Sequence, residues 1–149
     1  MIVLVDIDGT LANLDHRLHL IKNDAPRWDE FFDACSDDMP IVPIVELIEN
    51  ILDNDANTVI FVTGRPERIR LRTLGWLSKA FDNHKLDRPM LMMRKDGDHR
   101  KDDIVKAEML IALRQLGYNP DLAIEDRVRV AELYRQEGIV TLQCAAGDY

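Results

Sequence analysis

Two aspartates separated by one residue follow an apolar run at the start of this sequence. Residues 2–5 are Ile-Val-Leu-Val, and the chain continues with Asp6-Ile-Asp8-Gly-Thr. Such a run is typical of a buried parallel strand, and residues i and i+2 of a strand share a face. Asp6 and Asp8 therefore emerge together where the strand ends. Because crowded carboxylates are costly unless a cation or a reacting group neutralises them, the pair predicts phosphate chemistry.

An Asp-x-Asp pair after a strand can also be only a turn closed by an Asx hydrogen bond. Three further segments favour the chemical interpretation, because each brings a hydroxyl, an acid or an amine to the end of an element. They are the run at 58–63 that ends in Thr63-Gly64-Arg65-Pro, the run at 122–124 that ends in Glu125-Asp126-Arg, and a helix start with Asp102-Asp-Ile-Val-Lys106. The carboxyl ends of parallel strands meet at one edge of a sheet, so we expect these groups to converge there.

The composition predicts a single globular domain over residues 1–149. This length is enough to bury a core, and 46% hydrophobic with 31% charged residues argues against disorder. No apolar stretch approaches the ~20 residues of a membrane span, and no basic region precedes an apolar segment as in a secretory signal. Cys35 and Cys144 form no metal or redox motif. We expect a cytoplasmic protein with no membrane partner, and the sequence does not indicate its oligomeric state.

The negative charge is unevenly distributed along the chain. A formal net charge of −8 argues against a general nucleic-acid-binding protein. Residues 64–101, however, hold eleven Lys and Arg against five Asp and Glu, which leaves −14 on the remainder. This segment is either a solvated helix face rich in arginine or a basic surface beside the site for a phosphate-bearing substrate.

Apolar runs alternate with helical patterns along the sequence. Strands are predicted at 2–5, 58–63, 90–93, 122–124 and 140–143, and helices at about 44–52, 66–81, 102–116 and 129–137. Residues 13–39, with the segment Trp28-Asp-Glu-Phe-Phe32, predict a short helical insertion that forms a small cap. The pattern predicts an α/β fold, a mostly parallel sheet with helices on both faces.

The converging residues are of the types that hydrolysis of a phosphate monoester requires. Asp6 is a candidate nucleophile that would form an aspartyl-phosphate, and Asp8 is a candidate general acid and base. Mg²⁺ prefers a few carboxylates together with substrate oxygens, which suggests Asp6, Asp126 and the backbone carbonyl of Asp8 as ligands. Thr63 would hydrogen-bond a phosphoryl oxygen, and Lys106 would stabilise charge in the transition state.

Each of these residues also has an ordinary structural interpretation. A lysine on a helix, such as Lys106, usually lies on the surface. Asp102 can be an N-cap and an i,i+4 partner of Lys106. Thr63-Gly64 can be a plain strand exit, and Glu125-Asp126 can simply favour the N-terminus of a helix.

The motifs resemble those of the haloacid dehalogenase (HAD) superfamily, namely Asp6-Ile-Asp8-Gly-Thr, Thr63, Lys106 and Glu125-Asp126. A closer resemblance is to the 3′-phosphatase domain of phage polynucleotide kinase–phosphatases. It rests on Arg17, Thr63-Gly-Arg65, the run from Gly97 to Lys106, Ala123-Ile-Glu-Asp-Arg127 and Ala146-Gly-Asp-Tyr149.

The resemblance implies a Rossmann-like HAD fold and a magnesium-dependent phosphatase that removes 3′-phosphates from nucleic-acid ends or nucleotides for repair. Carried over by position, it implies two sets of site residues. The residues at the phosphate would be Arg17, Thr63, Gly64, Arg65 and Lys106, with Asp102 supporting Lys106. The residues at the metal would be Asp6, Asp8, Glu125 and Asp126. The family's penultimate acid is commonly aspartate. Glu125 is one methylene longer, so its role is less secure than that of Asp126.

Two other functions stay open at this point. The same chemistry would serve a 5′-nucleotidase or another small-molecule HAD phosphatase, which the overall acidity and the small cap favour, whereas Arg17, Arg65 and the basic segment favour a polynucleotide. A non-catalytic binding module would keep the fold but lack the nucleophile or the metal-binding acid, and both are present. No Gly-x-x-x-x-Gly-Lys-Ser/Thr loop occurs, so kinase activity is not expected from this chain.

Overall fold

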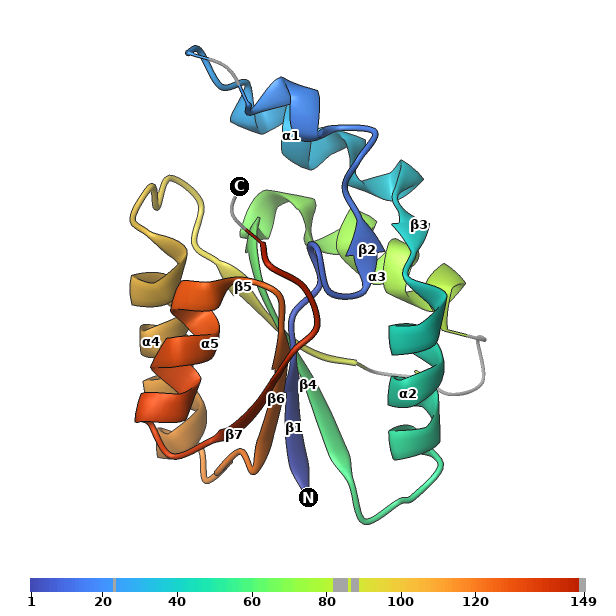
Figure 1. The fold of residues 1–149 in the computed structure, drawn as a ribbon, viewed down its shortest axis with the longest axis vertical. Helices are drawn as coiled ribbons and strands as arrows, with labels where there is room; N and C mark the ends of the chain where they lie inside the picture. The colour runs from blue at the N-terminus through green and yellow to red at the C-terminus, as the bar shows by residue number, and fades with distance from the viewer. Residues whose placement is uncertain (23, 82–85, 87–88, 148–149) are drawn as a thin grey trace.

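A computed structural model describes residues 1–22, 24–81, 86 and 89–147. Within these residues a parallel sheet has the strand order β5-β4-β1-β6-β7 (Figure 1). Its strands are β1 (Ile2–Val5), β4 (Thr58–Pro66), β5 (Met90–Arg94), β6 (Leu122–Glu125) and β7 (Val140–Gln143). No helix in the described part of the chain is long and apolar enough to cross a membrane.

Helices cover both faces of the sheet. Figure 1 shows α2 (Val42–Leu52) and α3 (Arg70–Ala80) on one side, and α4 (Asp102–Gln115) and α5 (Val128–Gln136) on the other. Alternate residues of β1 point to opposite faces, so Val3 and Val5 belong to the core beneath α2 and α3, while Leu4 belongs to the core beneath α4 and α5. The predicted α/β fold with a mostly parallel sheet is confirmed.

The strand register brings the site residues to one edge. Val5 lies opposite Phe61 on β4 and opposite Ile124 on β6, so the residues that follow in each strand reach the same level. β1 is the central strand, with β4 on one side and β6 on the other. Open α/β sheets place ligands at such carboxyl edges.

Residues 12–40 form an excursion above this edge. The strands β2 (Ala12–Asn13) and β3 (Met39–Pro40) pair antiparallel at its base. Between them lie η1 (Leu18–Leu20), α1 (Trp28–Asp33) and η2 (Ala34–Asp37), which Figure 1 shows beyond the carboxyl edge of the sheet. The sequence predicted the helical insertion but not the two-residue strands, which are too short to show a period.

The turn after β4 also differs in detail from the prediction. A helix was expected from Pro66, but β4 runs through Pro66, and its register against β5 shifts between Thr63 and Pro66. A 3₁₀ turn, η3 (Glu67–Ile69), then leads into α3. The irregular end of β4 turns Gly64 and Arg65 away from regular pairing and toward the site.

We expect Phe61→Ala to destabilise the fold because Phe61 is fully buried on β4, with its ring 5.7 Å from that of Phe81. Loss of a buried aromatic ring should lower the free energy of unfolding by about 3–5 kcal/mol. Urea denaturation followed by circular dichroism measures this change. Leu71→Ala is the matched control, because Leu71 is 84% exposed and its loss should change stability by about 0.5 kcal/mol or less.

Candidate active site

A buried lysine joins the ends of β1 and β6. Lys106 lies on the face of α4 that packs on the sheet, and its Nζ is 2.6 Å from Asp6 Oδ1 and 2.8 Å from Glu125 Oε2. Asp102, one helical turn earlier, has Oδ2 3.4 Å from the same nitrogen. An ammonium group thus stands among three carboxylates, and Lys106 is not the surface lysine that its helical position alone would suggest.

The acids in this cluster outnumber the bases: Asp6, Asp102, Glu125 and Asp126 lie close to a single ammonium group, that of Lys106. Burial raises the pKa of Asp6 to about 8, with repulsion from Glu125 adding to the effect and Lys106 opposing it. Burial also raises the pKa of Glu125 to about 7 and that of Asp126 to about 6. Burial alone would lower the pKa of Lys106, but the charges of Asp102, Asp6 and Glu125 hold it well above its ordinary value. Lys106 therefore stays an ammonium ion, and a further cation would favour ionisation of all the acids.

The donor set fits a hard divalent cation such as Mg²⁺. Two buried oxygens, Asp6 Oδ2 and Asp126 Oδ1, receive no hydrogen bond from the described residues. Carboxylate oxygens of Asp6, Glu125 and Asp126 lie within 4.8 Å of one another. Both oxygens of Glu125 are already engaged, Oε2 with Lys106 and Oε1 with the backbone N–H of Arg127 at 3.1 Å. Asp6 and Asp126 are thus the better ligands, since Mg²⁺ needs only one or two carboxylates.

A second buried network holds Asp8. Arg17 Nη2 donates to Asp8 Oδ1 at 2.7 Å, and Arg65 Nη2 donates to the same oxygen at 2.6 Å. Both guanidinium groups also bind Asp38, whose Oδ2 is 2.6 Å from Arg17 Nη2 and 2.9 Å from Arg65 Nη2. Two arginines and two aspartates thus balance one another; Arg17, Arg65 and Asp38 are buried, whereas Asp8 is partly exposed to the cavity. The Arg17 guanidinium lies 4.1 Å above the ring of Phe31.

This network fixes the ionisation of Asp8. Burial alone would raise the pKa of Asp8, but the charges and hydrogen bonds of Arg65 and Arg17 outweigh it and hold the pKa well below its usual range. Asp8 is therefore a carboxylate at neutral pH. The two acids of the Asp6-Ile-Asp8 motif are driven in opposite directions by their surroundings.

Asp102 acts within the site and does not cap α4. The N-cap position of α4 is Lys101 and makes no side-chain cap hydrogen bond, so the capping role considered for Asp102 is wrong. Its Oδ1 accepts a hydrogen bond from Arg94 Nη2 at 2.9 Å, while Oδ2 faces Lys106. A Cβ on Gly64 would lie 2.6 Å from Asp102 Oδ1, so a glycine is needed at position 64 for this approach.

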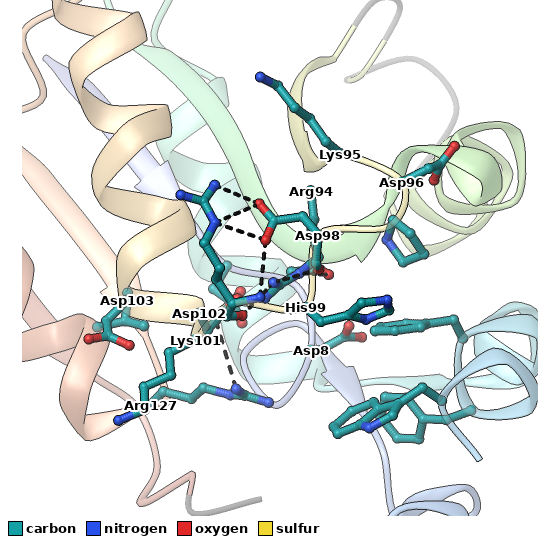
Figure 2. Close-up of a pocket in the computed structure, with 18 of the residues that line it drawn as sticks. Asp8, Arg94, Lys95, Asp96, Asp98, His99, Lys101, Asp102, Asp103 and Arg127 are labelled. Atoms are coloured by element: carbon teal, nitrogen blue, oxygen red, sulfur yellow. Dashed lines mark hydrogen bonds and ion pairs between the residues drawn. The ribbon is translucent and has the colours of Figure 1, made fainter. Parts of the chain in front are cut away.

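A cavity of about 1090 Å³ opens above these groups (Figure 2). Of the residues predicted for the site, those that line it are Asp6, Asp8, Gly64 and Asp102, and those buried behind its surface are Arg17, Thr63, Arg65, Lys106, Glu125 and Asp126. Thr63 is fully buried, and its Oγ1 accepts a hydrogen bond from the backbone N–H of Arg65 at 3.2 Å. The predicted residues thus form one contiguous group around the floor of the cavity.

The sequence matches a known domain family over its whole length. Residues 1–149 match the polynucleotide kinase PNKP phosphatase domain. The chain belongs to this family. It is a phosphatase of the HAD type, a hydrolase of phosphoric monoesters.

Solved structures agree with this membership. The chain is similar to a chain of the Pnkp1/Rnl/Hen1 complex, with 27% identity and a TM-score of 0.75 over 99% of this chain and 46% of that chain. A second structure, of the Pnkp1/Rnl/Hen1 RNA repair complex, gives 26% identity and a TM-score of 0.77 over 99% and 43%. The chain thus spans less than half of these relatives. The class C acid phosphatase from Bacillus anthracis, at 12% identity and a TM-score of 0.60 over 99% and 66%, shares the fold.

Three residues of the site in this PNKP-type domain were not predicted from the sequence. They are Asp38, which holds both arginines, Arg94, which holds Asp102, and Gly147, where a Cβ would lie 1.9 Å from Asp126 Oδ2. Asp38 follows another aspartate, and nothing in the sequence distinguishes the two. Gly147 belongs to the ending Ala146-Gly-Asp-Tyr149, on which the resemblance partly rests, and this is the one sequence signal for it; residues 148–149 lie outside the described part of the chain.

The raised pKa values predict that stability without a divalent cation falls as pH rises. Ordinary values of 3.8 and 4.5 apply to the unfolded chain, and about 6 to about 8 to Asp126, Glu125 and Asp6 in the fold. The folded state therefore binds more protons, and the stability present below pH 4 is lost as pH approaches 8. Urea unfolding at several pH values in a chelator measures this loss. Asp126→Asn should show a shallower decline, and equal slopes would contradict the assignment.

Proposed function

We propose that this chain is a magnesium-dependent phosphatase of 3′-phosphorylated nucleic-acid ends or nucleotides, acting through an aspartyl-phosphate on Asp6. The observation that carries the proposal is the convergence of Asp6, at the floor of the cavity, with Asp126 and the Lys106 ammonium group, which are buried directly behind it. A nucleophile, a metal-binding acid and a fixed positive charge are the groups that phosphoryl transfer needs.

The proposed reaction has two steps on the same phosphorus atom. Asp6 attacks phosphorus as a carboxylate, the ester P–O bond breaks, and Asp8 gives a proton to the leaving 3′ oxygen. Water then attacks the aspartyl-phosphate, Asp8 takes its proton, and phosphate leaves with Asp6 restored. Mg²⁺ held by Asp6, Asp126 and the Asp8 carbonyl would neutralise phosphoryl oxygens. Lys106, anchored by Glu125 and Asp102, stabilises the negative charge that develops.

The second step needs Asp8 as a carboxylate, and Asp8 is already ionised. Its low pKa, however, makes it a weak base until Arg17 and Arg65 are partly drawn away, and it must gain a proton before it can act as the acid of the first step. A phosphate dianion placed beside Asp8 supplies both effects, because a like charge raises a carboxyl pKa and an anion competes for Arg17 and Arg65. Arg65 already has a spare donor, since its buried Nη1 makes no hydrogen bond to the described residues.

The remaining site residues take supporting roles in this proposal. Arg17 and Arg65 hold both Asp8 and the arriving phosphate, and Thr63 fixes the turn that presents Gly64 and Arg65. Glu125 would be a poorer metal ligand than Asp126, because Lys106 and a backbone N–H already engage its oxygens. Residues 13–39 serve as a small cap over the floor.

A nucleic-acid substrate is favoured over a small sugar phosphate by three considerations. The family is defined by a polynucleotide enzyme, and the two structural relatives are components of a complex whose second structure is described as an RNA repair complex. The cavity volume of about 1090 Å³ is slightly above the ~300–1,000 Å³ typical of small-molecule sites. A 5′-nucleotidase is the competing activity, and the substrate assay below separates the two.

Substitution of the two aspartates should separate the steps of the reaction. Asp6→Asn should remove turnover entirely, because the amide cannot form the phosphoenzyme. Asp8→Asn should lower kcat on an oligonucleotide by about 10²–10⁴-fold. With p-nitrophenyl phosphate, whose leaving group needs no proton, Asp8→Asn should instead release a burst of nitrophenol equal to the enzyme concentration. Stopped-flow absorbance measures the burst, and Asp6→Asn turnover at the wild-type rate would rule out the covalent route.

The position of the phosphate should decide activity. With Mg²⁺, the chain should release phosphate from a 3′-phosphorylated oligonucleotide with kcat/KM well above that for its 5′-phosphorylated isomer or for a 5′-mononucleotide. Malachite green detection of free phosphate measures all three. Excess chelator should silence the enzyme and added Mg²⁺ should restore it. A preference for the 5′-mononucleotide would replace the proposal with a 5′-nucleotidase, and activity that survives chelation would remove the metal from it.

A further inference from the structure

An exposed tryptophan faces the cavity from the proposed cap. Trp28, the first residue of α1, is 44% exposed and lines the cavity together with Phe31 and Phe32. Its ring stacks on Phe32 at 5.9 Å between centroids with 27° between planes, and it meets Phe31 edge-on at 5.8 Å. Phe31 is buried and carries Arg17 on its ring. The tryptophan thus packs on two phenylalanine rings, one of which contacts Arg17 of the Asp8 network.

The opposite wall of the same cavity is polar and carries unpaired positive charge. It is formed by the loop that precedes α4 and by the start of α5, and Figure 2 shows Asp98, His99, Lys101 and Asp102 along it. Most of its arginines are engaged, as Arg94 is with Asp102. Lys101 and Arg129, by contrast, have no ion-pair partner among the residues that the structure describes and remain available for phosphates.

The cavity therefore has three chemically distinct sides. Its floor holds Asp6 and Asp8, its cap side presents the Trp28 ring, and its far wall offers Lys101 and Arg129. A flat apolar ring, a sugar and phosphates that flank it are the parts of a nucleotide chain. An aromatic face accepts any base by stacking, and cations along a groove bind the backbone without reading sequence.

We propose that Trp28 stacks on a base at an unpaired 3′ end of the substrate, so that the chain acts on single-stranded nucleic-acid termini with little sequence preference. This inference rests on the proposed function, and it adds the form of the substrate and a specificity residue. A base must be free of its own strand neighbours or partner to lie against Trp28, so a fully paired end fits this surface poorly.

The kinetic test compares Trp28→Ala with wild type on two 3′-phosphorylated oligothymidylates of equal length, one of which lacks the terminal base. We expect KM to rise by about 5- to 100-fold for the complete substrate, and much less for the abasic one. Wild type on the abasic substrate should resemble Trp28→Ala on the complete one. Trp28→Phe should recover most of the affinity, because a smaller ring still stacks. Leu71→Ala, which removes an exposed side chain away from the cavity, should behave as wild type.

Fluorescence gives a readout that does not depend on turnover. The chain has two tryptophans, and Trp76 is buried with Nε1 donating to the Asp38 carbonyl at 2.8 Å. In an Asp6→Asn background, which cannot turn over, the 3′-phosphorylated oligonucleotide should quench the emission of Trp28. The quenching should vanish in Asp6→Asn with Trp28→Phe, although that protein should still bind the oligonucleotide by anisotropy.

The outcomes separate the inference from the function beneath it. The stacking role would be overturned if Trp28→Ala raised KM equally for the complete and the abasic substrate. It would also be overturned if saturating oligonucleotide left the tryptophan fluorescence of the Asp6→Asn protein unchanged. Either result would leave the phosphatase proposal intact. If the wild-type chain releases no phosphate from a 3′-phosphorylated strand, the proposed function and the inference fail together. Equal kcat/KM on blunt-duplex and single-stranded 3′ ends would also overturn the inference.

Discussion

The site depends on one buried ammonium group. Lys106 crosses from α4 to the ends of β1 and β6 and contacts Asp6, Glu125 and Asp102 within 3.4 Å. Three carboxylates could not be buried together around a neutral side chain, because desolvation would protonate or expel them. One positive charge stabilises part of this group and leaves Asp6 and Asp126 short of a counter-charge. The same arrangement therefore holds the fold together at this edge and leaves a group of acids that a divalent cation would stabilise.

The two aspartates of the first motif have identical side chains, but their different surroundings shift their pKa values in opposite directions. Asp6 lies against other acids, and its pKa is raised to about 8, whereas Asp8 lies against Arg17 and Arg65, and its pKa is lowered. Pairs of titratable groups pushed apart by their surroundings are typical of acid–base sites. Strand geometry explains the split, since Asp8 lies beyond the end of β1 at an isolated bridge to Ala12, where it meets the 12–40 excursion.

The parallel strands and the convergence of Asp6, Lys106 and Asp126 could be predicted because each rests on a local pattern. Val3 and Leu4 alternate between cores, and chemical groups stand at the element ends. The rest depends on contacts between segments far apart in the sequence. Asp38 is buried only because two arginines from different segments meet it, and Asp102, which Arg94 holds, approaches Gly64 because no Cβ stands there. Such partners have no period or motif, and the two-residue strands β2 and β3 have none either.

Arg17 and Asp38 both come from the 12–40 excursion, so this segment supplies part of the buried network that holds Asp8. Arg65, on the sheet, would face Asp8 with one fewer partner if that excursion moved away, and the ionisation of Asp8 would change with it. The aromatic base that carries Trp28 is joined to the same arginine through Phe31. Contacts therefore run without a break from Trp28 through Phe31 and Arg17 to Asp8. If a nucleotide binds at Trp28 as proposed, it would bind to the same packed unit that sets the ionisation of Asp8.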